Sequence, residues 1–304
     1  MTDQRNLLVA ILLSIVILLG FQYFYEIPRM EQRKAELAQQ RAEEQARLPA
    51  PTTPDGITAD GSPVPIPGAP AAGAPQDRSQ VVAAGQRVRI DTPRLHGTIS
   101  TVGARIDDLT LADYHVTPDR SSPEIVLLSP AGTSQPYYAE FGWVPAAGTD
   151  QPVPNASTQW TAPDQPLTPD NPVTMTWDNG QGLVFEKTFA VDQNYMFTVT
   201  QRVRNNTGAP VSLVPYGLVS RHGTPPTLGY YILHEGPLGV FNGTLHEHKY
   251  GDIKEDGNIS YQSTGGWMGI TDKYWLVSLV PDQTASVDAR VRHTTANGQD
   301  RFQV

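Results

Sequence analysis

Cysteine is absent from the 304 residues of this chain, so disulfide bonds and thiolate metal sites are excluded. Basic residues are scarce: 22 lysines and arginines stand against 31 aspartates and glutamates, which gives a formal net charge of −9 at pH 7. Because a nucleic-acid-binding protein needs a basic face to neutralise phosphates, we expect no nucleic-acid partner. The G-x-S-x-G, G-x-G-x-x-G and phosphate-loop patterns are also missing. Nothing in these patterns indicates an enzyme.

Long hydrophobic runs are missing as well, apart from one near the amino terminus. Residues Leu7 to Tyr25 contain no charge, and as a helix they would span about 28 Å, close to the roughly 30 Å hydrocarbon core of a bilayer. The run ends in bulky aromatic rings, and no A-x-A-like cleavage site follows closely. The pattern predicts a retained transmembrane anchor over 7–25 rather than a cleaved signal peptide. The charges flanking the run leave its orientation open, because long following segments translocate largely regardless of charge.

Two segments of different composition follow the expected anchor. Residues 26–48 are rich in Ala, Glu, Gln and Arg but have no apolar face, which is typical of a solvated helical stalk. Residues 49–80 are rich in Pro, Ala and Gly with almost no large side chains, so they cannot bury enough apolar surface to fold. We therefore expect a disordered linker between the stalk and the rest of the chain.

From residue 81 onward the pattern changes to short β-branched or aromatic segments separated by Gly, Pro, Asn or Asp. Between Tyr195 and Val203 the odd-numbered residues are mostly apolar and the even-numbered ones mostly polar, which indicates a half-buried strand. "NNTG" at Asn205 to Gly208 is typical of a hairpin-type turn. The sequence predicts an all-β domain over 81–304, a large β-sandwich. "RFQV" at the end reads like a strand that is just starting, which suggests that this domain is truncated.

Only weak candidates for a chemical site are present. His246, Glu247 and His248 would place two imidazoles on one face of a strand, but no third ligand follows at a metal-motif spacing, so we expect no metal site. The neighbouring Asp107 and Asp108, together with Glu235, could form a carboxylate pair, but their spacing in the sequence does not fix their separation. His234 lies in a Gly-Pro turn region. We expect no catalytic, cofactor-binding or metal-binding residues.

The strongest local pattern is "GGWMGITDKYWLVSLVP", from Gly265 to Pro281. It predicts a strand over Trp267 to Ile270, a tight reversal at Thr271 to Lys273, and an apolar strand from Tyr274 to Val280. We interpret these residues as a hairpin in the domain core, with the Trp267 indole buried. "HEGPLGVFNG", from His234 to Gly243, is a second strand opened by Gly and Pro.

These two stretches, together with "QRNLLVAILLS", "FEKTFAVDQNYMFTVTQRVRN" and the Pro/Ala-rich linker, resemble the YidC/Oxa/Alb family of membrane protein insertases. The resemblance covers the anchor and the region from residue 81 to the end. It implies an inner-membrane protein with a cytoplasmic amino terminus and residues 26–304 in the periplasm, as a large twisted sandwich similar to sugar-mutarotase folds. It implies as partners nascent membrane proteins, the Sec translocon with its accessory subunits, and the lipid bilayer; no cofactor is implied.

Within this family, insertion is the work of a bundle of five transmembrane helices with a hydrophilic groove, and no second apolar run exists here. No residue of this chain can therefore be assigned to that groove. Two other functions remain open. A membrane-anchored carbohydrate-binding or mutarotase-like protein would need a general acid and base, for which His222 and Glu235 are the candidates. A structural spacer of the cell envelope would need neither.

Overall fold

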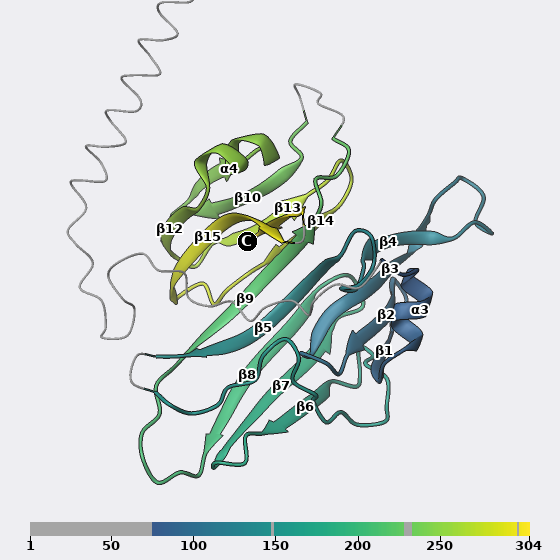
Figure 1. Cartoon of the computed structure of the whole chain (residues 1–304). Coiled ribbons are helices and arrows are strands. Elements are labelled where there is room, and N and C mark those ends of the chain that lie inside the picture. Colours follow the sequence, from purple (N-terminus) through teal and green to yellow (C-terminus); the bar gives the residue numbers. More distant parts are fainter. Residues whose placement is uncertain (1–74, 147–148, 228–232, 297) are drawn as a thin grey trace, which may run out of the picture. The chain divides into compact units, whose positions relative to one another are not determined.

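The computed structural model describes residues 75–146, 149–227, 233–296 and 298–304 (Figure 1). Within these ranges, no helix is long and apolar enough to cross a membrane. The expected anchor over 7–25, the stalk over 26–48 and most of the linker over 49–80 lie outside the described residues. The predictions for these segments therefore stay predictions.

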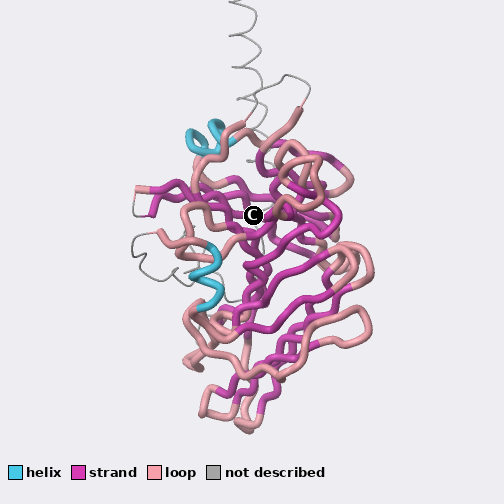
Figure 2. The backbone as a smooth tube through the Cα atoms, turned by 90° about the vertical axis from the view of Figure 1, so that its right-hand side faces the viewer, coloured by secondary structure: helices cyan, strands magenta, loops and turns pink. Residues whose placement is uncertain are grey.

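Strands dominate the described residues, and the two short helices stand out among them in Figure 2. The elements in chain order are α3 (Arg78–Ala83), β1 (Arg87–Asp91), β2 (Leu95–Ser100), β3 (Arg105–His115), β4 (Glu124–Leu128), β5 (Tyr137–Pro145), β6 (Val173–Asp178), β7 (Leu183–Val191), β8 (Phe197–Asn205), β9 (Leu213–His222), β10 (Gly236–Phe241), β11 (Thr244–Glu247), α4 (Tyr250–Asp256), β12 (Ile259–Thr264), β13 (Trp267–Thr271), β14 (Leu276–Leu279), β15 (Ser286–Ala296) and β16 (Gln299–Gln303). The predicted all-β class is confirmed.

The strands form one large sheet and two small ones. The nine-stranded sheet has the order β1-β2-β3-β5-β9-β16-β15-β12, with β4 paired to β3. The four-stranded sheet runs β11-β10-β13-β14, and the three-stranded sheet runs β6-β7-β8. The ladders between named strands are antiparallel. Strand β16 includes Arg301, Phe302 and Gln303 of the final "RFQV" and lies inside the large sheet between β9 and β15.

Each small sheet packs against the large one and buries an apolar layer. The indole of Trp143 in β5 meets the ring of Phe185 in β7 at a centroid distance of 5.1 Å and stacks on Trp160 at 6.5 Å. At the four-stranded sheet, the Tyr137 hydroxyl of β5 donates to the Ile270 carbonyl of β13 at 3.0 Å. These contacts give the β-sandwich that the sequence predicts, because each sheet hides its apolar side against another.

The predicted alternation is confirmed in β8 over Phe197 to Val203. The odd-numbered residues of this stretch are half-buried and the even-numbered ones are exposed. Tyr195, which was expected on the buried face, precedes the strand and is 42% exposed. The turn after β8 differs from its prediction: Asn205 to Gly208 do form a turn, but β8 pairs with β7 and the following β9 pairs with β5 and β16. The turn thus carries the chain from β8 in the three-stranded sheet to β9 in the large sheet, and it does not close a hairpin.

The folded region begins earlier than the linker prediction places it. Helix α3 occupies Arg78–Ala83, and Gln80 closes a capping box on Asp77. The Arg78 guanidinium reaches back to the buried Asp108 carboxylate at 2.5 Å. This ion pair holds the end of the expected linker on the large sheet. It could not be predicted from local patterns, because the two residues are thirty positions apart in the chain.

The hairpin β13–β14 exists, and part of it belongs to the core: Ile270 is fully buried there, and Met268, Val277 and Leu279 pack against the core. The expected burial of the Trp267 indole is wrong. Trp267 is only half-buried, and Tyr274, Leu276 and Val280 are 70%, 45% and 55% exposed. Strand β14 is an edge strand, and its residues are alternately exposed and half-buried, so one of its faces is open to solvent. The buried tryptophans among the described residues are Trp160, at 2% exposure and outside the named strands, and Trp143 of β5, at 4%.

Candidate functional site

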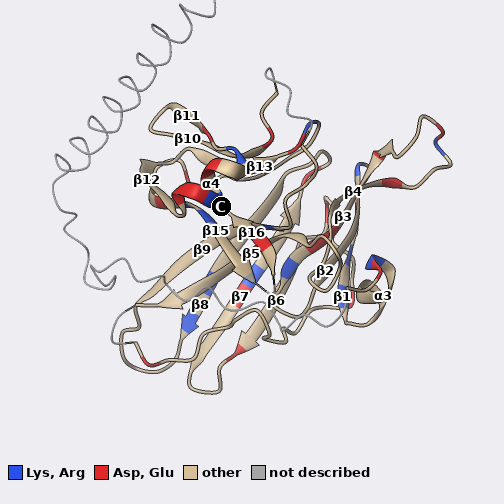
Figure 3. Ribbon diagram, turned by 45° about the horizontal axis from the view of Figure 1, so that its top comes forward, with Lys and Arg blue, Asp and Glu red and all other residues tan. Residues whose placement is uncertain are grey.

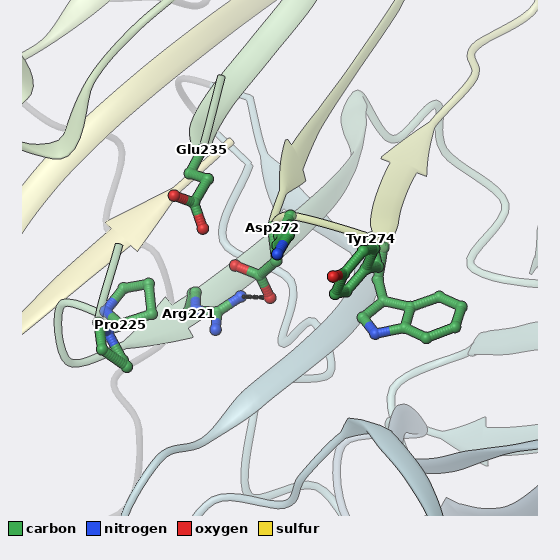
Figure 4. A pocket seen from close by; sticks show the side chains of 8 residues that line it. Arg221, Pro225, Glu235, Asp272 and Tyr274 are labelled. Atoms are coloured by element: carbon green, nitrogen blue, oxygen red, sulfur yellow. Dashed lines mark hydrogen bonds and ion pairs between the residues drawn. The ribbon is translucent and has the colours of Figure 1, made fainter. Parts of the chain in front are cut away.

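A pocket of about 290 Å³ lies where β9 ends, beside the start of β10 and the β13–β14 turn. It is open to solvent, and its walls carry both charged and aromatic side chains. The residues that line it are Arg221, Pro225, Pro226, Glu235, Asp272, Lys273, Tyr274 and Trp275. In Figure 4 the side chains of Arg221, Glu235 and Asp272 converge on the same space, and Tyr274 stands beside Asp272.

An ion pair between Arg221 and Asp272 lines one side of the pocket. The Arg221 guanidinium donates to the Asp272 carboxylate at 2.6 Å, and its Cζ lies 4.7 Å from the ring centroid of Tyr137. Burial alone would lower the pKa of Arg221, but the Asp272 carboxylate outweighs it and the pKa is raised. Burial likewise raises the pKa of Tyr137. Arg221 is therefore a permanent cation held in one orientation between an aromatic face and a carboxylate.

The β13–β14 turn positions the aromatic wall of the pocket, which consists of Tyr274 and Trp275. The Asp272 amide donates to the Trp275 carbonyl at 2.8 Å, and the Thr271 hydroxyl donates to the same carbonyl at 3.2 Å. This tight closure leaves Lys273 and Tyr274 at the tip, and the Lys273 ammonium lies 4.7 Å from the Tyr274 ring centroid. Behind them, Trp275 meets the ring of Tyr114 edge-on at 4.7 Å.

The two residues proposed for sugar chemistry do not meet. Glu235 lines the pocket, but His222 follows Arg221 in β9, so its side chain points to the opposite face of the strand. There, burial lowers the pKa of His222 to about 4, with Arg301 and Arg105 adding to the effect, and its Nε2 lies 3.5 Å from the Tyr138 hydroxyl. A neutral imidazole on one face of a sheet and a carboxylate on the other cannot act as an acid–base pair on one substrate.

His246 and His248 do come together, around an aromatic ring. The Tyr261 hydroxyl and His248 Nε2 are 2.8 Å apart, and the His246 ring centroid lies 4.6 Å from that of Tyr261. Burial, and then the neighbouring His246 and His234, lower the pKa of His248. Among the described residues, no group of three or more His, Asp or Glu side chains is arranged to hold a metal ion.

The acidic pair Asp107–Asp108 is buried and structural. Asp107 pairs with Arg87, while Asp108 pairs with Arg78 and accepts from the Thr98 hydroxyl at 2.6 Å. Burial raises the pKa of Asp107 to about 6 against the opposing effect of Arg87. Each of the two carboxylates pairs with a different arginine. Glu235 lies elsewhere, at the pocket beside the start of β10.

A second set of buried charges was not anticipated from the sequence. Figure 3 shows charged residues of both signs on the strands as well as on turns. The Arg105 Nε donates to the Glu140 carboxylate at 2.5 Å, and the Tyr216 hydroxyl donates to its other oxygen at 2.8 Å. Nearby, the Lys187 ammonium donates to the Gly103 carbonyl at 3.1 Å and lies 4.6 Å from the Trp160 ring centroid. The alternation Phe185–Lys187–Phe189 in "FEKTF" already places Lys187 on the buried face of its strand.

The sheets and the pocket define the folded part of the chain as a large antiparallel β-sandwich domain that carries a polar and aromatic surface pocket. Comparison with known families narrows this class. The YidC periplasmic domain matches residues 87–304, which is more than two thirds of the chain, and the chain belongs to this family.

Similar proteins extend the match to the amino-terminal residues. The chain is 47% identical over 297 residues to the membrane protein insertase YidC of Bradyrhizobium diazoefficiens, covering 95% of this chain and 48% of that protein. It is 49% identical to the protein of the same name from Methylorubrum extorquens, over 92% of this chain and 48% of that protein. The match to the Nitrobacter hamburgensis protein of this name is 46% over 100% of this chain. The chain thus spans about half the length of these relatives.

Proposed function

We propose that this chain is the amino-terminal and periplasmic part of a membrane protein insertase and chaperone. The observation that carries the proposal is the 46–49% identity to proteins named membrane protein insertase YidC, which runs through nearly the whole chain. Its clients would be nascent membrane proteins, inserted with or without the Sec translocon. The lipid bilayer and the accessory subunits of the translocon would be its other partners.

In this proposal the β domain has no covalent chemistry of its own. A polar segment that crosses a bilayer loses its hydration, and an insertase lowers that cost with a hydrated groove inside the membrane. The described residues form no such groove, so their contribution would be to present a rigid sandwich to clients and partners outside the membrane. The separation of His222 from Glu235 favours this function over a mutarotase-like enzyme.

Insertion is the activity that tests the proposal. A chimera in which these 304 residues replace the aligned part of the Bradyrhizobium diazoefficiens insertase should restore insertion of a model single-span protein in cells depleted of their own insertase. His222→Ala and Glu235→Ala in the chimera should leave insertion nearly unchanged, because neither is proposed to react with a substrate. Protease protection of the model protein is the measurement. Failure of the chimera at normal expression would contradict the proposal, and loss of insertion with His222→Ala alone would point to a reactive role for that histidine.

The absence of cysteine allows a direct test of location. We propose an inner-membrane anchor at 7–25 with a cytoplasmic amino terminus, so a membrane-impermeant maleimide added to spheroplasts should label Ser121→Cys but not Thr2→Cys. Ser121 is exposed in the β3–β4 connection, so the new thiol is accessible without disturbing the core. Both variants should be labelled once the membrane is disrupted, and the parent chain never. Labelling of Thr2→Cys in intact spheroplasts would refute the orientation.

A further inference from the structure

The aromatic wall of the pocket is larger than one exposed ring. Tyr274 is 70% exposed, and its ring centroid lies 6.4 Å from that of Trp275, which in turn meets Tyr114, itself 44% exposed. Single exposed apolar side chains are normal on a protein surface, but contiguous ones beside a pocket indicate a contact site. The face of an aromatic ring carries negative charge density, and it attracts the weakly positive C–H bonds of a ligand.

The charged wall is balanced in sign. Arg221 and Lys273 stand against Glu235 and Asp272, so the pocket has a formal charge of zero. A strongly anionic or cationic ligand would meet repulsion as well as attraction there. Hydroxyl groups fit better, because each one both donates and accepts and can bridge a guanidinium and a carboxylate.

A buried polar group lies close to the same place. Tyr250, the first residue of α4, is 4% exposed, and among the described residues its hydroxyl has no hydrogen-bond partner. Burial raises the pKa of Tyr250, and the charged groups that act on it further are Arg221, Asp272 and Glu235. The phenol therefore lies within electrostatic reach of three residues that line the pocket. A buried hydroxyl without a partner is costly, and a ligand hydroxyl that reached it would remove that cost.

We propose that this pocket binds a neutral pyranose ring of a short oligosaccharide. The C–H face of the ring would lie on one of the two aromatic rings, Tyr274 or Trp275, with the other ring at its edge, because the two rings are inclined at 64°. Its hydroxyls would meet the Arg221–Asp272 pair and Glu235. A volume of about 290 Å³ suits a ligand of one or two rings, at the small end of the range of roughly 300–1,000 Å³ for ligand pockets. The inference concerns binding without turnover, and it is independent of the insertase proposal.

The test uses the full chain in a zwitterionic detergent, because glucoside and maltoside detergents carry the proposed ligand. Saturation-transfer NMR with maltotriose and with triacetylchitotriose should show that at least one of them binds, with a Kd of ~1 mM, as expected for a small open pocket. An uncharged Ala-Pro decapeptide serves as the competing ligand class. Saturable binding of a sugar that the peptide does not displace is the expected result.

Variants locate the binding. Tyr274→Ala and Trp275→Ala should each raise the Kd by about 2- to 10-fold, the scale of losing an aromatic contact. Tyr250→Phe, which removes only the unpaired hydroxyl, should raise it several-fold without lowering the thermal unfolding temperature, because no hydrogen bond is lost. Tyr195→Ala removes a tyrosine that is 42% exposed outside the pocket and should have no effect. The proposal is overturned if neither sugar saturates below ~50 mM, if the Tyr274 and Trp275 variants bind as the parent does, or if the peptide binds in their place.

Discussion

Glu140→Ala should lower the free energy of unfolding by about 3–5 kcal/mol, the cost of removing one partner from a buried ion pair. The side chains of Glu140 and of Arg105, with which it pairs, are each 5% exposed. Removing the carboxylate leaves the guanidinium charged and enclosed against the Tyr138 ring, and it takes the acceptor from the Tyr216 hydroxyl. Denaturant titration of the full chain in detergent, followed by circular dichroism, is the measurement.

A matched control separates burial from the mere loss of an ion pair. Glu186 also lies on a strand and pairs with an arginine, but the Arg204 side chain is 59% exposed. Glu186→Ala should therefore change stability by no more than about 1 kcal/mol. The double variant Arg105→Met with Glu140→Leu should recover most of the loss, because an apolar pair needs no charge compensation. Equal effects of the two single variants would show that the interior is not as dry as the structure has it.

The fold class was predictable because strand patterning depends on local sequence. The alternation in β8 and the glycine and proline breaks are visible within about ten residues, and they suffice for an all-β sandwich. The order of strands was not predictable. Strand β9 pairs with β5 and with β16, which is some eighty residues later, and no local pattern encodes such a pairing.

The pocket was hidden for a related reason. "TDKYWLVSLVP" is apolar enough to be taken as a core strand, but Tyr274 lies in the turn before β14 and Leu276 lies on the exposed face of β14. The Arg221–Asp272 pair joins residues fifty-one positions apart in sequence, so neither residue stood out alone. Glu235 was identified as a candidate, but with the wrong partner, because alternation along β9 turns His222 away from the pocket.

Lys187 makes the stability of the domain depend on pH in a direction that can be stated. Its side chain is enclosed, its hydrogen bond goes to an uncharged carbonyl, and burial lowers its pKa from 10.5 to about 7. Between these values the unfolded chain holds a proton that the folded chain has released, so stability rises with pH. This gain in stability is complete above pH 10.5, where Lys187 is neutral in both the folded and the unfolded chain, and it is lost as the pH falls towards 7.

The slope expected from one such group is about 1.4 kcal/mol per pH unit, hence about 2–3 kcal/mol between pH 7 and pH 9. Lys187→Met keeps the length and the contact with Trp160 but cannot titrate, so it should remove this rise.

Asp107, with a pKa of about 6, is already ionised in this window. The tyrosines whose pKa burial raises change the balance only near pH 10 and above, where the unfolded chain begins to lose their protons. The difference between the two unfolding curves from pH 7 to pH 9 therefore reports Lys187 alone, and parallel curves would mean that the ammonium stays charged inside the fold.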